Sequence, residues 1–174
     1  MKNDLYWTKT ILTVYRYLER ICGGMDKIIM QRALSSSNIV GQNYFYNNTF
    51  TLTQKIIDLS ERKVTLINLK VLIEDSLAEI DEKDSQILIE KYVDGLRNPQ
   101  LCESLGVGLR TIFRKIECAE YSFKSKLCSK GYNDIKLRDM LQKETWIKNV
   151  YNSIALKKEE YSLSNSEFSK AVSM

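Results

Sequence analysis

The fold is decided by one stretch near the middle of the chain, residues 81–127, which reads DEKDSQILIEKYVDGLRNPQLCESLGVGLRTIFRKIECAEYSFKSKL. Its first part predicts a helix from about Asp81 to Val93, because acidic residues stand in the opening turn, where the helix dipole favours them. The Asp94-Gly95 pair that follows predicts a turn. The stretch therefore begins with one helix that ends at a defined point.

A second, short helix is predicted to begin at the only proline of the chain. Asn98 is the expected N-cap, and Pro99 suits the first helical position because an N–H there has no partner within the helix. The helix covers residues 100–105 and ends at Gly106, since glycine adopts the left-handed conformation without steric cost. A third helix is predicted to begin near Leu109. This order of elements predicts a helix-turn-helix.

The apolar positions agree with this layout. Five of them are expected in the core between the helices: Leu101, Leu105, Val107, Ile112 and Ile116. Cys102, four residues before Gly106, is small enough to let two helices cross closely. The alternative is an ordinary packing unit of three helices with no DNA-binding role.

The outward face of the third helix carries side chains that suit DNA. With Ile112, Ile116 and Ala119 inward, a step of about 100° per residue places arginine, glutamate and aromatic residues on the opposite side. Arginine can bind guanine bidentately, glutamate accepts from the cytosine amino group, and an aromatic edge suits the thymine methyl group. The predicted DNA-binding set is Arg110, Thr111, Phe113, Arg114, Lys115, Glu117, Tyr121, Lys124 and Lys126. Its lysines, with Lys130, are expected at phosphates.

Charge is divided unevenly along the chain, whose net charge is +4. Residues 109–130 contain six Lys or Arg and two Glu, while residues 74–94 contain eight acidic residues and two Lys. A basic helix beside an acidic segment suits a module that binds DNA in one orientation. The acidic segment has two other interpretations, as a contact for a basic protein and as charge that only caps helices and aids solubility.

The N-terminal region, residues 1–76, is predicted to be helical with a loop at 35–53. The first helix has apolar residues at three- and four-residue steps, and the Gly23-Gly24 pair is a point at which it can bend or break. A second helix over 54–79 carries two apolar stripes with seven-residue spacing. The stripes are Leu52, Leu59, Leu66, Ile73 and Ile80, and Ile57, Val64, Val71 and Ala78. Two stripes predict two packing partners, the N-terminal helix in a hairpin and a second subunit. The alternative is one broad core contact.

Residues 131–174 are predicted to form a C-terminal helix and a tail. Asn133 and Asp134 can cap this helix, and its apolar residues continue to Ile154. After Lys158 the composition is typical of a frayed end.

The absence of histidine excludes several kinds of chemistry. No Ser-His-Asp triad, Cys-His pair or mixed Cys/His zinc site is possible, so we expect no enzyme activity, cofactor or metal. The four cysteines include no CxxC pair, and reduced thiols in a cytoplasmic protein are a simpler interpretation than a four-thiolate zinc site. No apolar run has the roughly 18 residues that a membrane helix needs.

Residues 101–120, LCESLGVGLRTIFRKIECAE, resemble the helix-turn-helix of region 4 in sigma factors. The family pattern is Ile-Ala, two residues, Leu-Gly-Val/Ile-Ser, two residues, Thr-Val, and the matching positions here are Leu101, Cys102, Leu105, Gly106, Val107, Thr111 and Ile112. Together with the preceding helix and the exit at 127–132, residues 56–132 are similar to phage-encoded late-gene transcriptional activators of Gram-positive hosts. Gly108 replaces the family's capping serine, and Cys102 replaces its alanine.

These observations predict an all-α protein with a long helical hairpin (1–76), a tri-helical helix-turn-helix domain (77–130) and a C-terminal helix and tail (131–174). The resemblance implies a sequence-specific transcriptional regulator whose third helix reads the major groove. Its expected partners are double-stranded DNA, RNA polymerase and a second copy bound through the N-terminal and 54–79 helices. The competing hypothesis is a helical interaction or scaffold protein with a vestigial helix-turn-helix.

Overall fold

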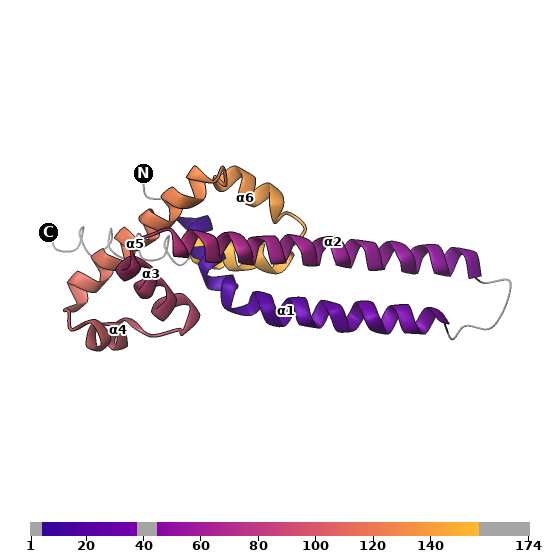
Figure 1. Ribbon diagram of the computed structural model, residues 1–174, viewed down its shortest axis with the longest axis horizontal. Coiled ribbons are helices and arrows are strands. Elements are labelled where there is room, and N and C mark those ends of the chain that lie inside the picture. The colour runs from indigo at the N-terminus through magenta and orange to yellow at the C-terminus, as the bar shows by residue number, and fades with distance from the viewer. Residues whose placement is uncertain (1–4, 38–44, 157–174) are drawn as a thin grey trace, which may run out of the picture.

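The computed structural model describes residues 5–37 and 45–156. Within these ranges the chain forms helices joined by turns and contains no strand, which confirms the predicted all-α class (Figure 1). The elements are α1 (Tyr6–Ser37), α2 (Phe45–Ala78), α3 (Glu82–Leu88), the π-helical turn η1 (Ile89–Val93), α4 (Asn98–Leu105), α5 (Leu109–Ser129) and α6 (Asp134–Met140). A further helical segment covers residues 145–156. None of the described helices is both long and apolar enough to cross a membrane.

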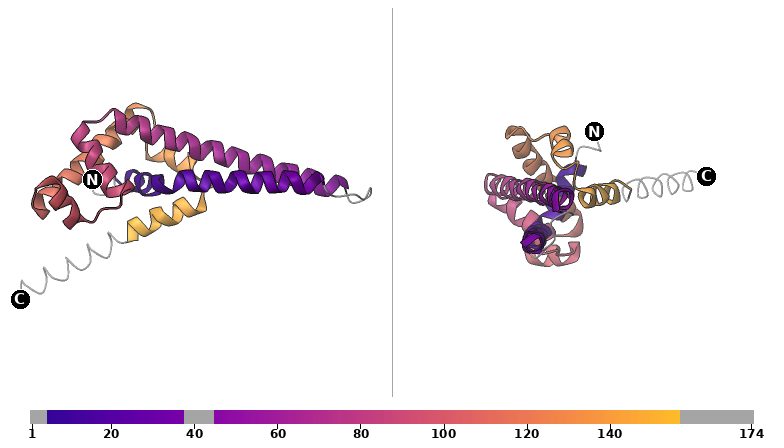
Figure 2. Two further views of the ribbon diagram at one scale, coloured as in Figure 1. Left: turned by 60° about the horizontal axis from the view of Figure 1, so that its bottom comes forward. Right: turned by 90° about the vertical axis from the view of Figure 1, so that its right-hand side faces the viewer.

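The long helices α1 and α2 form an antiparallel hairpin that extends away from the remaining helices (Figures 1 and 2). On α2, Leu66 and Ile73 of the first predicted stripe are fully buried, whereas Ile57, Val64 and Val71 of the second are exposed. The predicted packing of the first stripe against the N-terminal helix is confirmed, and the predicted second subunit stays a prediction. The alternative of one broad core contact is wrong, because the described part of the chain leaves the second stripe uncovered.

The hairpin differs from the prediction near its tip. The loop expected at 35–53 is wrong at 35–37 and at 45–53, because α1 continues to Ser37 and α2 begins at Phe45. Residues 38–44 of that range lie outside the described residues. Once a helix is nucleated, each added residue costs little, so Ser and Asn residues with modest helix propensity can extend it. For the same reason α1 passes through Gly23 and Gly24 without a break.

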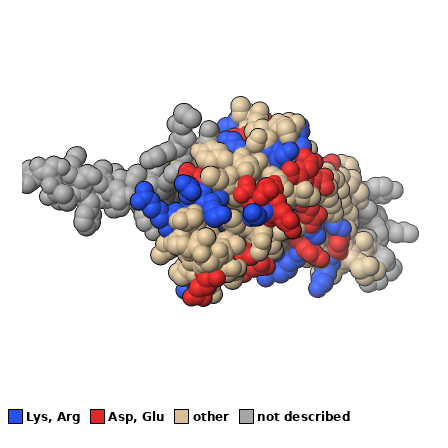
Figure 3. Space-filling view, turned by 60° about the vertical axis from the view of Figure 1, so that its left-hand side comes forward, with Lys and Arg blue, Asp and Glu red and all other residues tan. Residues whose placement is uncertain are grey.

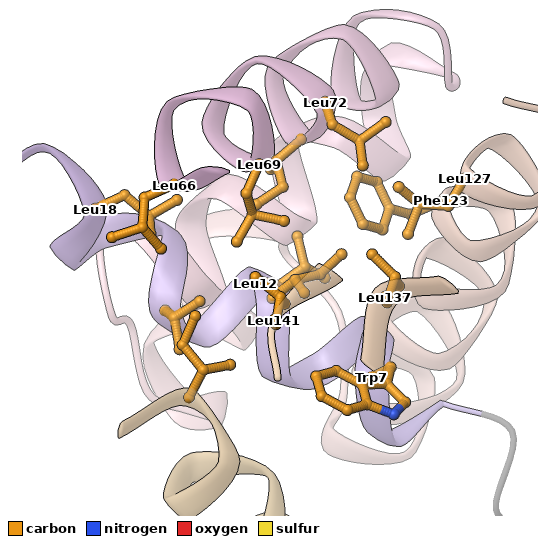
Figure 4. Close-up of a cluster of buried hydrophobic side chains, with 14 of the residues drawn as sticks. Trp7, Leu12, Leu18, Leu66, Leu69, Leu72, Phe123, Leu127, Leu137 and Leu141 are labelled. Carbon is orange, nitrogen blue, oxygen red and sulfur yellow. The ribbon is translucent and has the colours of Figure 1, made fainter. Parts of the chain in front are cut away.

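One core joins all three predicted ranges of the chain. It contains Trp7 and Leu12 from α1, Leu69 from α2, Phe123 from α5 and Leu141 from the turn after α6 (Figure 4). The C-terminal half of α5 therefore packs against the hairpin, while its N-terminal half belongs to a second, smaller core. The module that contains α3, α4 and α5 is consequently fixed to one end of the hairpin.

The C-terminal region contains a break that the sequence did not indicate. Asn133 caps α6 as predicted, because its side chain accepts a hydrogen bond from the Lys136 N–H at 2.9 Å. The single predicted helix is wrong, however, since α6 ends at Met140 and residues 141–143 form turns. The buried Glu144 that follows accepts hydrogen bonds at 2.8 and 3.0 Å from the guanidinium of Arg62 on α2. This long-range ion pair favours the turn over a continuous helix. The tail predicted after Lys158 lies outside the described residues.

Candidate nucleic-acid interface

The start of α4 sets the first half of the candidate interface. Arg97 is its N-cap, and Asn98 is already helical, so the predicted cap at Asn98 is one residue too late. The physical reason is Gln100, whose side-chain oxygen accepts a hydrogen bond from the Arg97 N–H at 2.8 Å. This contact satisfies the N–H of the residue before the helix. Pro99 lies in the first turn, as predicted.

The turn between α4 and α5 depends on glycine. Gly106 has φ 62° and ψ 33°, the left-handed conformation that the sequence predicts. It lets the Val107 N–H donate to the Cys102 carbonyl at 3.1 Å, which closes the end of α4. Gly108 then caps α5 with extended backbone and provides no side-chain hydrogen bond.

These two glycines should respond to substitution in opposite directions. Gly106→Ala should lower the free energy of unfolding by about 1 kcal/mol, because a Cβ is disfavoured at positive φ. Gly108→Ser should raise it by a few tenths of a kcal/mol, because its φ is negative, nothing lies within 4 Å of a new Cβ, and serine can cap the α5 N–H groups. Urea denaturation followed by circular dichroism measures both. Equal effects of one sign would contradict this account of the turn.

A small core holds α3, α4 and α5 together. Ile87 from α3, Leu101 from α4, and Ile112 and Ile116 from α5 are buried in it. The remaining predicted core positions are half-buried around it: Cys102, Leu105 and Val107. All the positions expected to face inward therefore do so. This packing fixes the opposite face of α5 toward solvent.

That outward face brings five of the predicted DNA-binding residues together. Arg110, Phe113, Arg114, Glu117 and Tyr121 are all exposed and follow one side of α5 at three- and four-residue steps. Phe113 and Tyr121 expose 54% and 43% of their surface, which is unusual for large aromatic residues. Within the described ranges, the side chains of Arg110, Arg114 and Glu117 make no ion pair or hydrogen bond. These side chains are thus free to meet a ligand.

The other predicted residues lie elsewhere on α5. Thr111, Lys115 and Lys126 are half-buried on its flanks. Lys124 lies toward the C-terminal end, where its Nζ is 3.4 Å from Asp134. Lys130 just beyond the helix pairs at 2.8 Å with Glu79. Lys124 and Lys130 therefore have partners within the chain and are less available to phosphate than Lys115.

The acidic segment 74–94 has a structural use. The Asp84 carboxylate on α3 accepts a hydrogen bond at 2.8 Å from Ser122 of α5, and Glu90 of η1 accepts one at 3.2 Å from Ser104 of α4. The bond from Lys130 lowers the pKa of Glu79. These contacts hold α3 and η1 against the helices of the candidate interface. The interpretation as helix-capping charge is confirmed for Asp81, which accepts a hydrogen bond from the Lys83 N–H.

Sequence reasoning missed the most buried charge in the module. Glu120 of α5 is 1% exposed, accepts a hydrogen bond at 2.6 Å from the Tyr92 hydroxyl and lies 3.1 Å from the Lys9 ammonium of α1. Lys91 approaches it at 3.9 Å. Burial and the neighbouring carboxylate raise the pKa of Tyr92, and burial lowers the pKa of Lys91. The helical period could have indicated its burial, because Glu120 lies four residues after Ile116 and so falls on the inward face of α5.

Charge at this end of the molecule is mixed. Figure 3 shows basic and acidic side chains in neighbouring patches on the end that carries the module. The cysteines Cys22, Cys102, Cys118 and Cys128 are free thiols, and the described residues contain no group arranged to hold a metal ion. Comparisons of the chain with protein-family models, with curated proteins and with solved structures give no match.

Proposed function

We propose that the chain is a sequence-specific DNA-binding transcriptional regulator that reads the major groove with α5. The observation that carries this proposal is the face of α5, where Arg110, Arg114 and Glu117 are exposed and have no partner in the described ranges. An arginine that is free in the unbound protein breaks no ion pair when it binds a base. Two arginines and a glutamate on one helix face can distinguish guanine from cytosine.

The other exposed residues of the module would hold the protein in place on the DNA backbone and would not read the base sequence. Lys115 flanks the reading face and is the lysine best placed to meet a phosphate. The first turn of α4 is exposed at Pro99 and Gln100 and is a candidate contact for the DNA backbone. A regulator of this kind also contacts RNA polymerase, as the sigma region 4 resemblance implies.

Salt dependence tests the proposal directly. The logarithm of the association constant for duplex DNA should fall linearly with the logarithm of salt concentration, because bound lysines and arginines release counterions. Lys115→Ala should weaken binding to all duplexes alike and lower that slope by about 1. Fluorescence anisotropy with labelled duplexes at several salt concentrations measures both.

A matched control lies far from the module. Lys27 is exposed on the half of α1 near the hairpin tip, so Lys27→Ala removes the same charge and should leave the slope unchanged. Absence of any duplex binding at low salt would instead favour the scaffold hypothesis.

A further inference from the structure

The outer face of α2 carries an apolar stripe that nothing in the described chain covers. Phe50, Ile57, Val64 and Val71 recur every seven residues, and Ile67 lies between the last two. Their exposed fractions are 74% for Phe50, 45% for Ile57, 55% for Val64, 40% for Ile67 and 47% for Val71. These five residues are called the outer stripe. On the opposite side of α2, Leu66, Leu69 and Ile73 are fully buried.

The spacing of the outer stripe is that of a coiled-coil seam. If Ile57, Val64 and Val71 are a positions of a heptad, Ile67 is a d position. A seven-residue repeat keeps an apolar seam in line along two supercoiled helices, whereas exposed apolar residues on a monomer are usually scattered singly. From Phe50 to Val71 the seam is about 32 Å long at the rise of an α-helix. It can therefore contact a helix of similar length.

The residue types favour a partnership of two helices. Three of the four a positions, Ile57, Val64 and Val71, are β-branched, which favours two-stranded over higher-order coiled coils, and the fourth is Phe50. The intervening d positions include Ser60 and Glu74, so the seam is only partly apolar. This composition is typical of an interface that forms reversibly.

The charges that flank the outer stripe identify the partner. Lys63 and Lys70 lie along one edge, at g positions, while Glu61 and Asp75 lie along the other, at e positions. In a parallel pair of identical helices each g position meets the e position five residues further along the other copy, so Lys70 meets Asp75 and Lys63 meets Asn68. Lys63 and Glu61 already pair within the chain, with Asp26 and Lys143. The Lys70–Asp75 pair, formed twice in the dimer, therefore carries the complementarity, although Lys70 also lies 3.6 Å from Glu19 of its own chain. In an antiparallel pair like charges meet. The stripe is therefore complementary to a second copy of itself in the parallel orientation.

We propose that the outer stripe is the interface of a parallel homodimer. The α2 helices of the two copies would lie side by side, with both C-terminal ends at the same end of the dimer. Because the α3–α5 module follows the C-terminal end of α2, both modules would lie at that end (Figure 1). If the proposed DNA binding also holds, the dimer faces a DNA site with two-fold symmetry.

Sedimentation equilibrium of the full chain, without DNA, tests the dimer. We expect the mass to rise with concentration from 20.3 kDa toward twice that value. The triple variant Ile57→Gln, Val64→Gln, Val71→Gln should raise the dimer dissociation constant by about 100-fold or more, since it removes apolar surface from the seam of both copies. Glutamine is a better helix former than valine or isoleucine, so circular dichroism should show no loss of helix.

The control replaces exposed apolar residues outside the outer stripe. Met30→Gln with Ile135→Gln changes side chains that are 68% and 61% exposed, and it should leave the dissociation constant unchanged. A wild-type chain that stays monomeric throughout the micromolar range overturns the proposal. A triple variant that dimerises like the wild type overturns the assignment of the surface. Since no DNA is present, neither result depends on the proposed DNA binding.

Cross-linking tests the orientation. In a Cys118→Ser, Cys128→Ser background, which removes the two exposed native thiols, a Val71→Cys variant should form a disulfide between copies on mild oxidation. An antiparallel pair centred on the stripe would instead place position 57 opposite position 71. Efficient cross-linking between an Ile57→Cys chain and a Val71→Cys chain, without the Val71→Cys self-link, would overturn the parallel arrangement.

Discussion

Glu120→Ala should lower the free energy of unfolding by about 3 kcal/mol, at the lower end of the cost of removing one partner from a buried ion pair. The carboxylate is 1% exposed and is bound by the Tyr92 hydroxyl and the Lys9 ammonium. Its removal leaves the Tyr92 hydroxyl without an acceptor and Lys91 without a counter-charge. Lys9 is 35% exposed, so water can solvate it, which is why the lower end of the range applies.

Two variants separate the roles of this carboxylate. Glu120→Gln keeps a hydrogen-bond acceptor for Tyr92 but removes the charge. Its free energy of unfolding should therefore lie between those of the wild type and the alanine variant. Glu117→Ala changes an exposed glutamate one turn earlier on α5 and should cost less than about 0.5 kcal/mol. Urea denaturation followed by circular dichroism measures all three. A Glu120→Ala variant as stable as the Glu117→Ala variant would contradict the buried pair.

Arg114→Ala should weaken binding to the preferred DNA site by about 1–3 kcal/mol and relax the base preference at one position. Arg114 lies in the middle of the exposed face of α5, one turn after Arg110 and one turn before Glu117. A bidentate contact to guanine at that point supplies both affinity and discrimination. The loss should therefore be large for the preferred site and small for unrelated duplexes.

Comparing the loss of affinity for the preferred site with the loss for unrelated duplexes shows whether Arg114 contacts a base or only a phosphate. Arg138→Ala removes an arginine from α6 that is 63% exposed, and it should change neither affinity nor preference. Fluorescence anisotropy at fixed salt concentration measures the affinities of both variants. Equal weakening of Arg114→Ala on every duplex would mean that Arg114 contacts phosphate rather than a base.

Local signals made the elements of the module predictable. The lone Pro99 and the left-handed Gly106 mark the ends of a short helix, and each acts through backbone geometry that needs no distant partner. The N-cap predicted at Asn98 is one residue too late, because the Gln100 side chain accepts a hydrogen bond from the Arg97 N–H and Arg97 is therefore the N-cap. The exposed face of α5 followed from the helical period alone. The DNA-binding role of that face stays a prediction.

Long-range contacts were not predictable from the sequence. Glu120 pairs with Lys9 and Glu144 pairs with Arg62, and both partners are far away in the sequence, so a local pattern shows only an acidic residue. Lys124 lies only ten residues before Asp134, but the turn between α5 and α6 brings the two side chains together, which helical spacing does not show. The loop predicted at 35–53 failed for another reason, because composition underestimates how far a nucleated helix can extend. Of the two partners predicted from the stripes on α2, the structure shows α1 against the first stripe, and the second subunit stays a prediction.

The most direct test of the central claim is selection of binding sites from randomised duplexes by the wild type and by Arg114→Ala, with Arg138→Ala as control. The account predicts that the wild type enriches one sequence motif and that the control enriches the same motif. The Arg114→Ala variant should lose preference at one base pair, or two adjacent ones, while keeping the rest. Failure of the wild type to enrich any motif, or an unchanged motif with Arg114→Ala, would contradict the account.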